Sequence, residues 1–402
     1  MLTKIGPDTV ARWNAYMDGL GTRLRDKRQR ASFAMYALGL LNDGERKSME
    51  PIAARACGDP ALTHGVHERL IHFLADSPWK DGPIREYATQ HAVNAMQSQG
   101  PIRTWIVDDT GFLKQGKHSP GVQRQYTGSA GKTANCQVGV SLVLASDHAH
   151  VAADFRLYIP ESWADDRDRC RRAHIPDDIG YEPKWALALS MIETALQSGL
   201  PKGVVLADCD YGNKAVFRDM LTELGLQYAV EIQSTTKLRH FRPDGTLGER
   251  VTVSELGSAL ASTRRRITWR EGTKKPLHSR FARARVVVER EDGTEREPEW
   301  LFVEWREDEP GAPKYVLSTV PPNVTCKQLV RTFKCRWRIE RSYEDLKGEL
   351  GLDHYEGRSF VGWHHHVSVV LACYAFLIAE HVRSFPPSAR SKSDTSPLHH
   401  AA

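Results

Sequence analysis

The chain has 402 residues, of which 41% are hydrophobic and 26% are charged. This composition is typical of globular proteins and excludes the intrinsically disordered, collagen-like and disulfide-rich miniprotein classes. At roughly 100 to 200 residues per domain, the length predicts two to four domains with a sizeable hydrophobic core. Lysine and arginine outnumber aspartate and glutamate by 55 to 50, and this net charge of +5 is too small by itself to indicate a nucleic-acid partner.

Membrane and disulfide-bonded classes also lack support in the sequence. The longest apolar run, Val367–Ala379, is shorter than the roughly 20 residues that a bilayer span needs, and the N-terminus shows no signal-peptide pattern. The seven cysteines form no CxxC pair, and their odd number leaves one over, so neither a zinc ribbon nor a disulfide framework is predicted. We therefore expect an intracellular protein without membrane contact.

The first 98 residues are predicted to form a separate helical domain. Apolar residues recur at helical spacing in ASFAMYALGLL and in HERLIHFLADSPW. From Ile102 onward the pattern changes to short runs rich in β-branched residues, WIVDD, CQVGVSLVLAS and HVAADFRLYIP, which predict three strands in a meander. This change sets the first domain boundary near residue 98.

An α/β pattern follows the meander. Pro183 begins a predicted helix in KWALALSMIETALQSG, and a strand in GVVLADCD, a helix in NKAVFRDMLTELG and a strand in QYAVEIQ come after it. Residues 99–233 are therefore predicted to form the first part of an α/β core. Residues 234–322 carry hairpin-like segments and are predicted to be a β-rich insertion.

Helices are predicted to complete the core over residues 323–384. The first runs from Thr325 to about Glu349 and stops at Gly351, and the second from about Trp363 to Arg383. The tail, residues 385–402, is rich in proline and serine and is predicted to be disordered.

Two of the predicted strands end in acidic residues. WIVDD places Asp108 and Asp109 at the end of one strand, and VVLADCD places Asp208 and Asp210 after another. Ligands of α/β sheets usually bind at the carboxyl ends of strands. An aspartate in such a place also commonly begins a turn, which is the simpler interpretation of either pair taken alone.

A third acidic feature lies in FKCRWRIERSYEDLKGEL. On one continuous helix, a single face carries five side chains at spacings of three or four residues: Phe333, Arg336, Glu340, Glu344 and Lys347. Ion pairs between neighbouring turns on a solvated face give the same pattern. Taken with the strand-end acids, however, a carboxylate from this helix completes a set of hard oxygen ligands suited to Mg²⁺.

The same segment carries a family resemblance. Its spacing F-x2-R-x3-E-x6-K, from Phe333 to Lys347, resembles the Y-x2-R-x3-E-x6-K signature of bacterial insertion-sequence DDE transposases, with Phe in place of Tyr. Three upstream blocks resemble core blocks of that family in the same order: DDTGFLKQGKHSPGVQRQYTGSAGKTANCQVGVSL, RLYIPESWADDRDR and VVLADCDYGN. The resemblance therefore extends from residue 103 to about residue 358.

This resemblance implies both a fold and a site. The fold is α/β: an RNase H-like mixed sheet flanked by helices, with the β-rich insertion before the last catalytic helix and an N-terminal helical domain. The catalytic acids and metal ligands are Asp108, Asp208 and Glu340. Three neighbouring acids stay open as alternatives: Asp109, Asp210 and Glu344.

The resemblance also implies an activity and partners. The expected enzyme is a Mg²⁺-dependent DNA endonuclease and strand transferase that uses two ions, for which Mn²⁺ can substitute, to cut transposon ends and join them to target DNA. Its partners are double-stranded DNA and, in the synaptic complex, a second copy of the chain, and it works in the bacterial cytoplasm at the nucleoid. The rival interpretations are a catalytically inactive domesticated DNA-binding protein and a stand-alone nuclease on the same core.

Several basic residues are predicted to contact DNA. Near the cut these are Arg336 and Lys347, with Phe333 at the aromatic position of the signature, where the ring is kept and the hydroxyl lost. In the loop after the first acid they are Lys114, Lys117, Arg124 and Lys132, for which a solvated loop is the equal alternative. The N-terminal run from Arg23 to Arg30 is a further candidate for binding the transposon end. The cluster His364–His366 is predicted to be a helix start or a DNA-facing group rather than a metal site.

Overall fold

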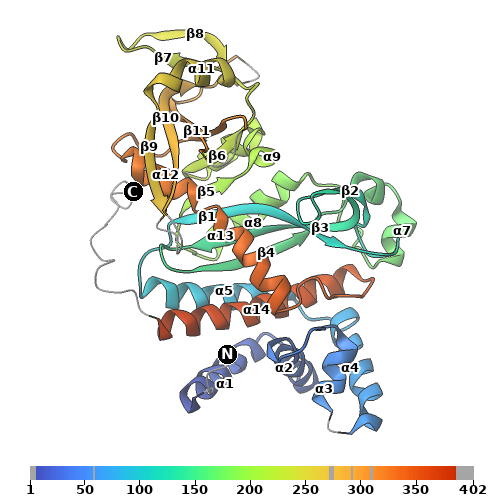
Figure 1. Cartoon of the computed structure of the whole chain (residues 1–402). Helices are drawn as coiled ribbons and strands as arrows, with labels where there is room; N and C mark the ends of the chain where they lie inside the picture. The colour runs from blue at the N-terminus through green and yellow to red at the C-terminus, as the bar shows by residue number, and fades with distance from the viewer. Residues whose placement is uncertain (1–5, 58, 271–275, 291–292, 308–310, 386–402) are drawn as a thin grey trace. The chain divides into compact units, whose positions relative to one another are not determined.

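The protein is described by a computed structural model covering residues 6–57, 59–270, 276–290, 293–307 and 311–385 (Figure 1). The chain forms two compact units. Unit 1 contains the chain up to Ile102, Asp108–Pro201 and the segment that begins at Arg338. Unit 2 contains Arg103–Val107 and Lys202–Trp337.

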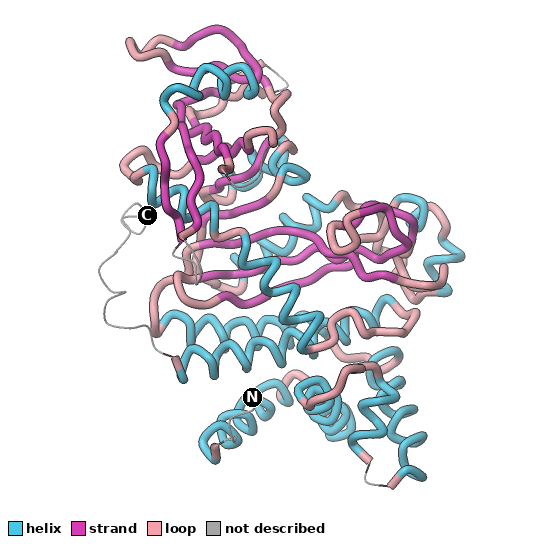
Figure 2. The backbone as a smooth tube through the Cα atoms, viewed as in Figure 1, coloured by secondary structure: helices cyan, strands magenta, loops and turns pink. Residues whose placement is uncertain are grey.

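The first part of unit 1 is helical, as predicted, and its helices are drawn cyan in Figure 2. Asp26 fixes the start of the second helix, because its carboxylate accepts hydrogen bonds from the backbone N–H groups of Arg28 and Gln29, both at 2.9 Å. Gly39 permits close packing on the third, since a Cβ at this position would come within 2.3 Å of the Ile52 side chain. The elements are α1 (Pro7–Gly21), α2 (Lys27–Leu41), α3 (Met49–Ala56), η1 (Pro60–Leu62), α4 (Thr63–Ala75) and α5 (Asp81–Gln97).

Among the described residues, four strands lie wholly or partly in unit 1. The three predicted strands are present as β1 (Thr104–Leu113), β3 (Lys132–Ala145) and β4 (His150–Leu157), and β1 also extends into unit 2. A fourth, β2 (Gln123–Thr127), was not predicted, because GVQRQYTG lacks an apolar alternation. β2 and β4 each pair antiparallel with β3, and three helices follow: α6 (Glu161–Ala164), α7 (Arg167–Arg172) and α8 (Lys184–Gln197). Pro183 is the N-cap of α8, so its predicted role as a helix start is confirmed.

The central helix of unit 1 is α14 (Phe360–Ser384), which lies beside α5 in Figures 1 and 2. It extends beyond the predicted apolar run, and by length and composition it is long and apolar enough to cross a bilayer. Its most apolar window is 67% buried, however, and it contacts α2, α4, α5 and β4, as a core helix of a soluble protein also does. Of the tail predicted to be disordered, residues 386–402 lie outside the described residues.

The sheet of unit 2 is mixed. β1 runs parallel to β5 (Val204–Ala207), and β5 runs parallel to β6 (Tyr228–Ile232). The next strands pair antiparallel in the order β6-β12-β11-β10-β7-β8, and β9 pairs with β10 on the same edge as β7, opposite β11. Their bounds are β7 (Lys237–Phe241), β8 (Leu247–Thr252), β9 (Arg265–Arg270), β10 (Leu277–Val287), β11 (Glu299–Trp305) and β12 (Lys314–Ser318).

Residues 234–322 are therefore rich in strands, as predicted. They also hold one helix that was missed, α11 (Val253–Leu260), which begins with a capping box between Thr252 and Glu255 and is followed by η2 (Ala261–Thr263). Leu238, Leu301 and Leu317 are among the buried residues that form a separate hydrophobic core for this part of unit 2. The remaining helices of the unit are α9 (Cys209–Gly212), α10 (Ala215–Glu223) and α12 (Cys326–Lys334).

Candidate active site

Two of the predicted catalytic acids follow a pair of parallel strands. In unit 2, residues 104–106 of β1 pair in register with residues 204–206 of β5, and the last pair is Ile106 with Leu206. Asp108 and Asp208 each follow that last pair by two residues in their own segments. The two acids therefore stand at equivalent positions in the sequences of two paired strands.

The side chains of Asp108 and Asp109 leave opposite faces of β1, because successive residues of a strand alternate. The Asp109 carboxylate forms an ion pair with Lys184 at the start of α8, with Nζ and Oδ2 at 2.9 Å. Asp108 shares its face with Thr110, and its Oδ1 accepts a hydrogen bond from the Asp109 backbone N–H at 2.8 Å. The two neighbouring acids thus have different surroundings.

Lys347 contacts the face of β1 that carries Asp108. Its Nζ donates hydrogen bonds to Thr110 Oγ1 at 2.9 Å and to the Gly111 carbonyl oxygen at 2.8 Å, and lies 5.0 Å from the centre of the Phe112 ring. Burial lowers the pKa of Lys347. In this structure, therefore, the ammonium group that was predicted to contact DNA holds its own segment against the strand of the first acid.

Tyr343 makes a second contact between the late helix and the sheet. Its hydroxyl lies 2.6 Å from Ser141 Oγ on β3, and Ser141 Oγ donates to the Asp108 carbonyl oxygen at 3.3 Å. The Tyr343 ring also packs edge-on against Phe155, with the centroids 6.0 Å apart. The helix that carries Glu340 thereby packs over β1 and β3 within unit 1.

The segment predicted as one helix from Thr325 to Glu349 is interrupted. α12 ends at Lys334, where tight i to i−3 hydrogen bonds form, such as Cys335 N–H to the Thr332 carbonyl oxygen at 3.0 Å. A new helix, α13 (Trp337–Glu344), follows, and the last turn, η3 (Asp345–Glu349), is a π-helix. The prediction of one continuous helical face is therefore wrong.

This break separates the residues of the signature. Phe333 belongs to unit 2, is 7% exposed, and packs against the rings of Phe281 and Phe302 with centroids 5.9 Å away. Arg336 also belongs to unit 2, and its Nε lies 3.8 Å from Glu231 Oε1. Neither side chain lies on the helix of Glu340.

On α13, Glu340 and Glu344 are both exposed and lie one turn apart. Glu344 lies 3.2 Å from the guanidinium of Arg341, which also contacts Asp345 at 2.8 Å. Burial raises the pKa of Asp345. Glu344 thus belongs to an ion-pair network along the helix.

Asp208 is the N-cap of α9 in unit 2. Its Oδ1 accepts a hydrogen bond from the Asp210 N–H at 3.0 Å, which fixes the turn, while Asp210 itself is exposed. Gly212 closes this turn against β6, because a Cβ there would meet the Glu231 carbonyl oxygen at 2.0 Å. The Arg218 guanidinium donates to the Gly212 carbonyl oxygen. The turn after Asp208 is therefore held on both sides.

The other predicted DNA contacts lie at the surface of unit 1. Lys117, Arg124 and Lys132 are all exposed, Arg124 on β2 and Lys132 at the start of β3. Lys114, in the same loop, instead donates to the Tyr355 carbonyl oxygen at 2.6 Å, and burial lowers its pKa. The first three remain available to an anionic partner.

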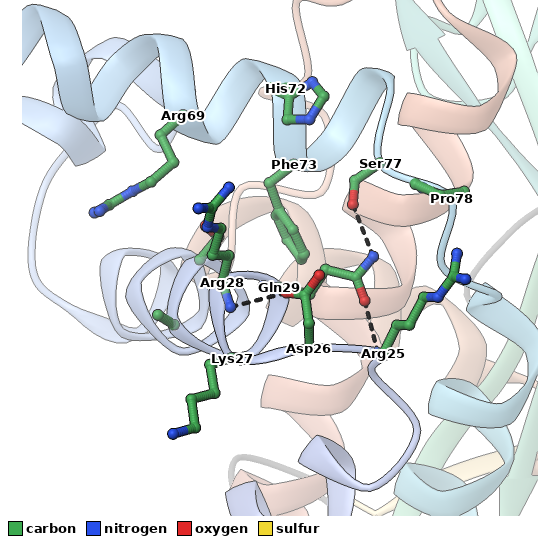
Figure 3. Close-up of a pocket in the computed structure, with 12 residues that line it drawn as sticks. Arg25, Asp26, Lys27, Arg28, Gln29, Arg69, His72, Phe73, Ser77 and Pro78 are labelled. Carbon is green, nitrogen blue, oxygen red and sulfur yellow. Dashed lines mark hydrogen bonds between the residues drawn. The ribbon is translucent and has the colours of Figure 1, made fainter.

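The N-terminal basic run borders a hollow of about 750 Å³ between α2 and α4 (Figure 3). Arg25, Lys27 and Arg28 line it from α2 and the turn before, and Arg69 and His72 line it from α4. A hydrogen bond of 3.0 Å from the buried Gln29 to Ser77 Oγ closes one side. The run thus forms part of a basic concave surface.

The histidine cluster lies inside unit 1. α14 does begin at Phe360, shortly before the cluster, but the DNA-facing interpretation is wrong because His365 and His366 are buried. The ring nitrogens of His365 contact the carbonyl oxygens of Leu74 and Trp79 at 2.8 and 2.9 Å. These rings tie α14 to the N-terminal helices.

The buried His366 is expected to make the folded protein less stable at acidic pH. Its ring nitrogens contact the Tyr36 hydroxyl at 2.8 Å and the Leu352 carbonyl oxygen at 3.2 Å, and burial lowers its pKa to about 4. Since the unfolded chain binds a proton near pH 6.5 that the folded ring rejects, this histidine stabilises the fold above that pH. We expect the free energy of unfolding to fall by about 1.4 kcal/mol per pH unit from this residue between about pH 6.5 and 4.

Urea denaturation at several pH values in this window measures the effect. His366→Asn is expected to remove the uptake of about one proton on unfolding. The slope of the free energy of unfolding against pH should therefore fall by about 1.4 kcal/mol per pH unit. His72→Asn is the matched control for the loss of an imidazole at the surface, because the side chain of His72 is 72% exposed. Equal slopes for His366→Asn and wild type would contradict the assignment.

No group of three or more His, Cys, Asp or Glu side chains forms a preassembled metal site within the described residues. Asp108 and Glu340 belong to unit 1, and Asp208 belongs to unit 2. Their donor atoms are carboxylate oxygens, which are the ligands that Mg²⁺ prefers in proteins. By donor chemistry, these residues fit a Mg²⁺ site.

Two residues of this region escaped the sequence analysis. Tyr343 follows Glu340 by three residues, so helical spacing alone would have placed both on one face. Lys184 gave no comparable signal, because nothing in the sequence connects a residue at the start of α8 with Asp109, 75 positions earlier.

Comparison with known families identifies the class of protein. Residues 19–276 match the family described as DDE superfamily endonuclease, and residues 186–376 match the transposase DDE domain. The chain therefore belongs to the DDE superfamily of endonucleases, and the resemblance seen in its sequence is confirmed.

A more specific likeness is to a probable transposase for insertion sequence element IS701 from Microchaete diplosiphon. The two sequences are 29% identical over 210 residues, which are 52% of this chain and 50% of that protein. The chain thus spans about half the length of the curated relative it matches.

Proposed function

We propose that this chain is an insertion-sequence transposase that cuts DNA at the ends of its element and joins those ends to target DNA. The observation that carries the proposal is the setting of Asp108. Its strand pairs in parallel with the strand that precedes Asp208, and its face of β1 is contacted by the segment that follows Glu340. Family membership supports a nuclease-type reaction on this arrangement.

The proposed ligands of two Mg²⁺ ions are Asp108, Asp208 and Glu340. When bound, the ions supply an activated oxygen nucleophile, first water and then the freed 3′-hydroxyl, and relief of charge on the leaving oxygen. Mn²⁺ is expected to substitute. The carboxylates provide the negative charge that binds such ions, and no covalent bond between protein and DNA is required.

Other residues of the chain prepare this site. Lys184 neutralises Asp109 on the far face of β1, which favours Asp108 as the ligand. Lys347 and Tyr343 hold the segment around Glu340 against β1 and β3. The capping bond of Asp208 orients one carboxylate oxygen toward its own turn. These contacts reduce the motion of the acids before metal binds.

The family supports an RNase H-like core for the mixed sheet and its helices. In this proposal residues 99–233 and 323–384 form the catalytic core, residues 234–322 are an insertion in it, and residues 1–98 form a DNA-binding domain. The basic hollow between α2 and α4 is its DNA-contacting surface. A homodimer that holds two transposon ends, acting at the nucleoid in a bacterial cytoplasm, completes the proposal.

Double-stranded DNA is the proposed substrate and target. The exposed residues Lys117, Arg124 and Lys132 are expected to contact its backbone. Contacts with DNA near the cut are also proposed for Arg336, Lys347 and Phe333. A role for Lys347 in DNA binding would require its ammonium group to exchange its bonds with β1 for bonds with a phosphate.

The test uses labelled DNA that carries the flanking ends of the element, with Mg²⁺ or with EDTA. Wild type is expected to nick at the element boundary only with metal, and Asp208→Asn is expected to lose this activity while binding the same DNA. Binding without cleavage in wild type, with either Mg²⁺ or Mn²⁺, would overturn the proposal and favour a domesticated DNA-binding protein. Cleavage without strand-transfer products would instead indicate a stand-alone nuclease.

A further inference from the structure

A second basic hollow, of about 620 Å³, lies in unit 1. It is lined by Trp163 and by basic side chains from three separate segments: Lys117, His118, Arg169, Arg172 and Arg358. Only Lys117 of this set was singled out by its sequence. The charge of the hollow therefore arises from folding, since its three segments are distant in the sequence, with Arg169 lying 52 positions after Lys117.

Backbone and aromatic contacts fix the walls of this hollow. The Arg169 guanidinium lies 3.6 Å above the Trp163 ring and donates to the Lys117 carbonyl oxygen at 3.1 Å. The segment of Arg358 is held beside the end of α7, because Phe360 N–H donates to the Ala173 carbonyl oxygen at 2.8 Å. The Arg169 side chain, and the backbone that carries Arg358, are thus placed before any partner binds.

The charges in the hollow are not neutralised by the protein. In the described part of the chain, Lys117, Arg172 and Arg358 form no ion pair. Two other arginines of the same helix do form them, Arg167 with Asp177 and Arg171 with Asp168. The acid that lines the hollow, Asp166, caps α7 by accepting from the Arg169 N–H at 2.9 Å. These exposed cations are therefore available to an anionic partner.

We propose that this hollow binds phosphates of the duplex DNA backbone without reading the base sequence. The inference rests on the proposed function, because it takes DNA as the partner. The hollow is much larger than one phosphate, and its cations come from three segments, as contacts with successive phosphates require. The neighbouring strand β2, with the exposed Arg124, is attached beside it by a 3.0 Å hydrogen bond from Ser162 to Gln123, which extends the basic surface.

The test measures binding of the full-length chain to a fluorescent duplex of arbitrary sequence, in EDTA, between 50 and 200 mM salt. The variant combines Lys117→Ala, Arg172→Ala and Arg358→Ala, and spares Arg169 because that side chain packs on Trp163. Each lost phosphate contact is expected to reduce the slope of log K against log salt by about 0.9, so the triple variant should lose about 2 to 3 from this slope. Its affinity at 100 mM salt should fall more than about 10-fold.

Arg171→Ala is the matched control. It removes one positive charge from the same helix, but a charge already paired with Asp168, so it should leave the slope and the affinity close to those of wild type. Thermal unfolding of each variant shows whether the fold is retained. For an unstable triple variant, Arg172→Glu and Arg358→Glu alone serve the same purpose, with an expected loss of about one or more in slope each.

An unchanged slope in the folded triple variant would overturn the inference. So would stabilisation of wild type, but not of the triple variant, by millimolar inorganic phosphate with DNA binding unaffected, since this result describes a small-anion site. The assay contains no metal and no cleavage step, so it tests phosphate binding by the hollow separately from the proposed catalysis. Cleavage with an unchanged slope rejects this inference alone, and a lowered slope without cleavage supports it and rejects the transposase proposal.

Discussion

Replacing Glu340 by glutamine is expected to abolish DNA cleavage and to leave DNA binding close to that of wild type. The substitution removes one negative charge and almost no volume, so the helix should keep its packing on β1 and β3. A metal ion supplies several kcal/mol of transition-state stabilisation, and its loss corresponds to a fall in the cleavage rate of at least about 10³-fold. The rate is measured on labelled element ends under single-turnover conditions.

Glu344→Gln is the control for this change. Glu344 lies one turn later on the same exposed side of α13 and pairs with Arg341, so its replacement should cost at most about 1 kcal/mol of stability and no more than a few-fold in cleavage. Full cleavage by Glu340→Gln together with loss of cleavage by Glu344→Gln would transfer the catalytic assignment to Glu344.

The sequence predicted the elements of the fold well where their hydrophobic period is strong. The strands that lead to Asp108 and Asp208 are runs of buried β-branched and apolar residues, and both appear as predicted. β2 was missed because it is an edge strand whose residues are mostly polar, and antiparallel pairing with β3 forms it. Pairing of this kind depends on residues distant in the sequence, which no local pattern reports.

The segment of residues 325–349 shows where prediction from the hydrophobic period failed. Its period of three to four residues predicted one continuous helix, but spacing along a sequence does not reveal where hydrogen bonding changes from i−4 to i−3 or i−5. The break near Cys335 and the π-turn at Asp345–Glu349 separate Phe333 from Glu340 and direct Lys347 to β1. A helical face drawn from the sequence therefore grouped residues that the fold divides between two units.

Charge was also harder to predict than hydrophobicity. The net charge of +5 gave no clear signal, yet folding gathers basic side chains in two hollows, one beside Trp163 and one between α2 and α4. Whether an arginine is free for a partner depends on its nearest carboxylate, as the contrast between Arg171 and Arg172 illustrates. Such pairing follows from side-chain positions in the folded protein, and composition does not contain it.

The neighbouring acids of β1, Asp108 and Asp109, are expected to differ strongly in their importance for DNA cleavage. Asp108→Asn is expected to reduce cleavage by at least about 10³-fold with little change in stability, for the same reason as the change at Glu340. Asp109→Asn is expected to keep cleavage within about 10-fold of wild type. It should instead lower the free energy of unfolding by about 1 kcal/mol, because it weakens the partly buried ion pair with Lys184.

These two substitutions differ by one position and remove the same charge, so each controls for the other. Lys184→Gln should reproduce the stability loss of Asp109→Asn and should also retain cleavage, because the pair acts on the far face of β1. Cleavage with Mg²⁺ and with Mn²⁺, and urea denaturation of each variant, provide the measurements. Loss of cleavage in Asp109→Asn at unchanged stability, with cleavage retained in Asp108→Asn, would show that the alternation of β1 has been assigned to the wrong face.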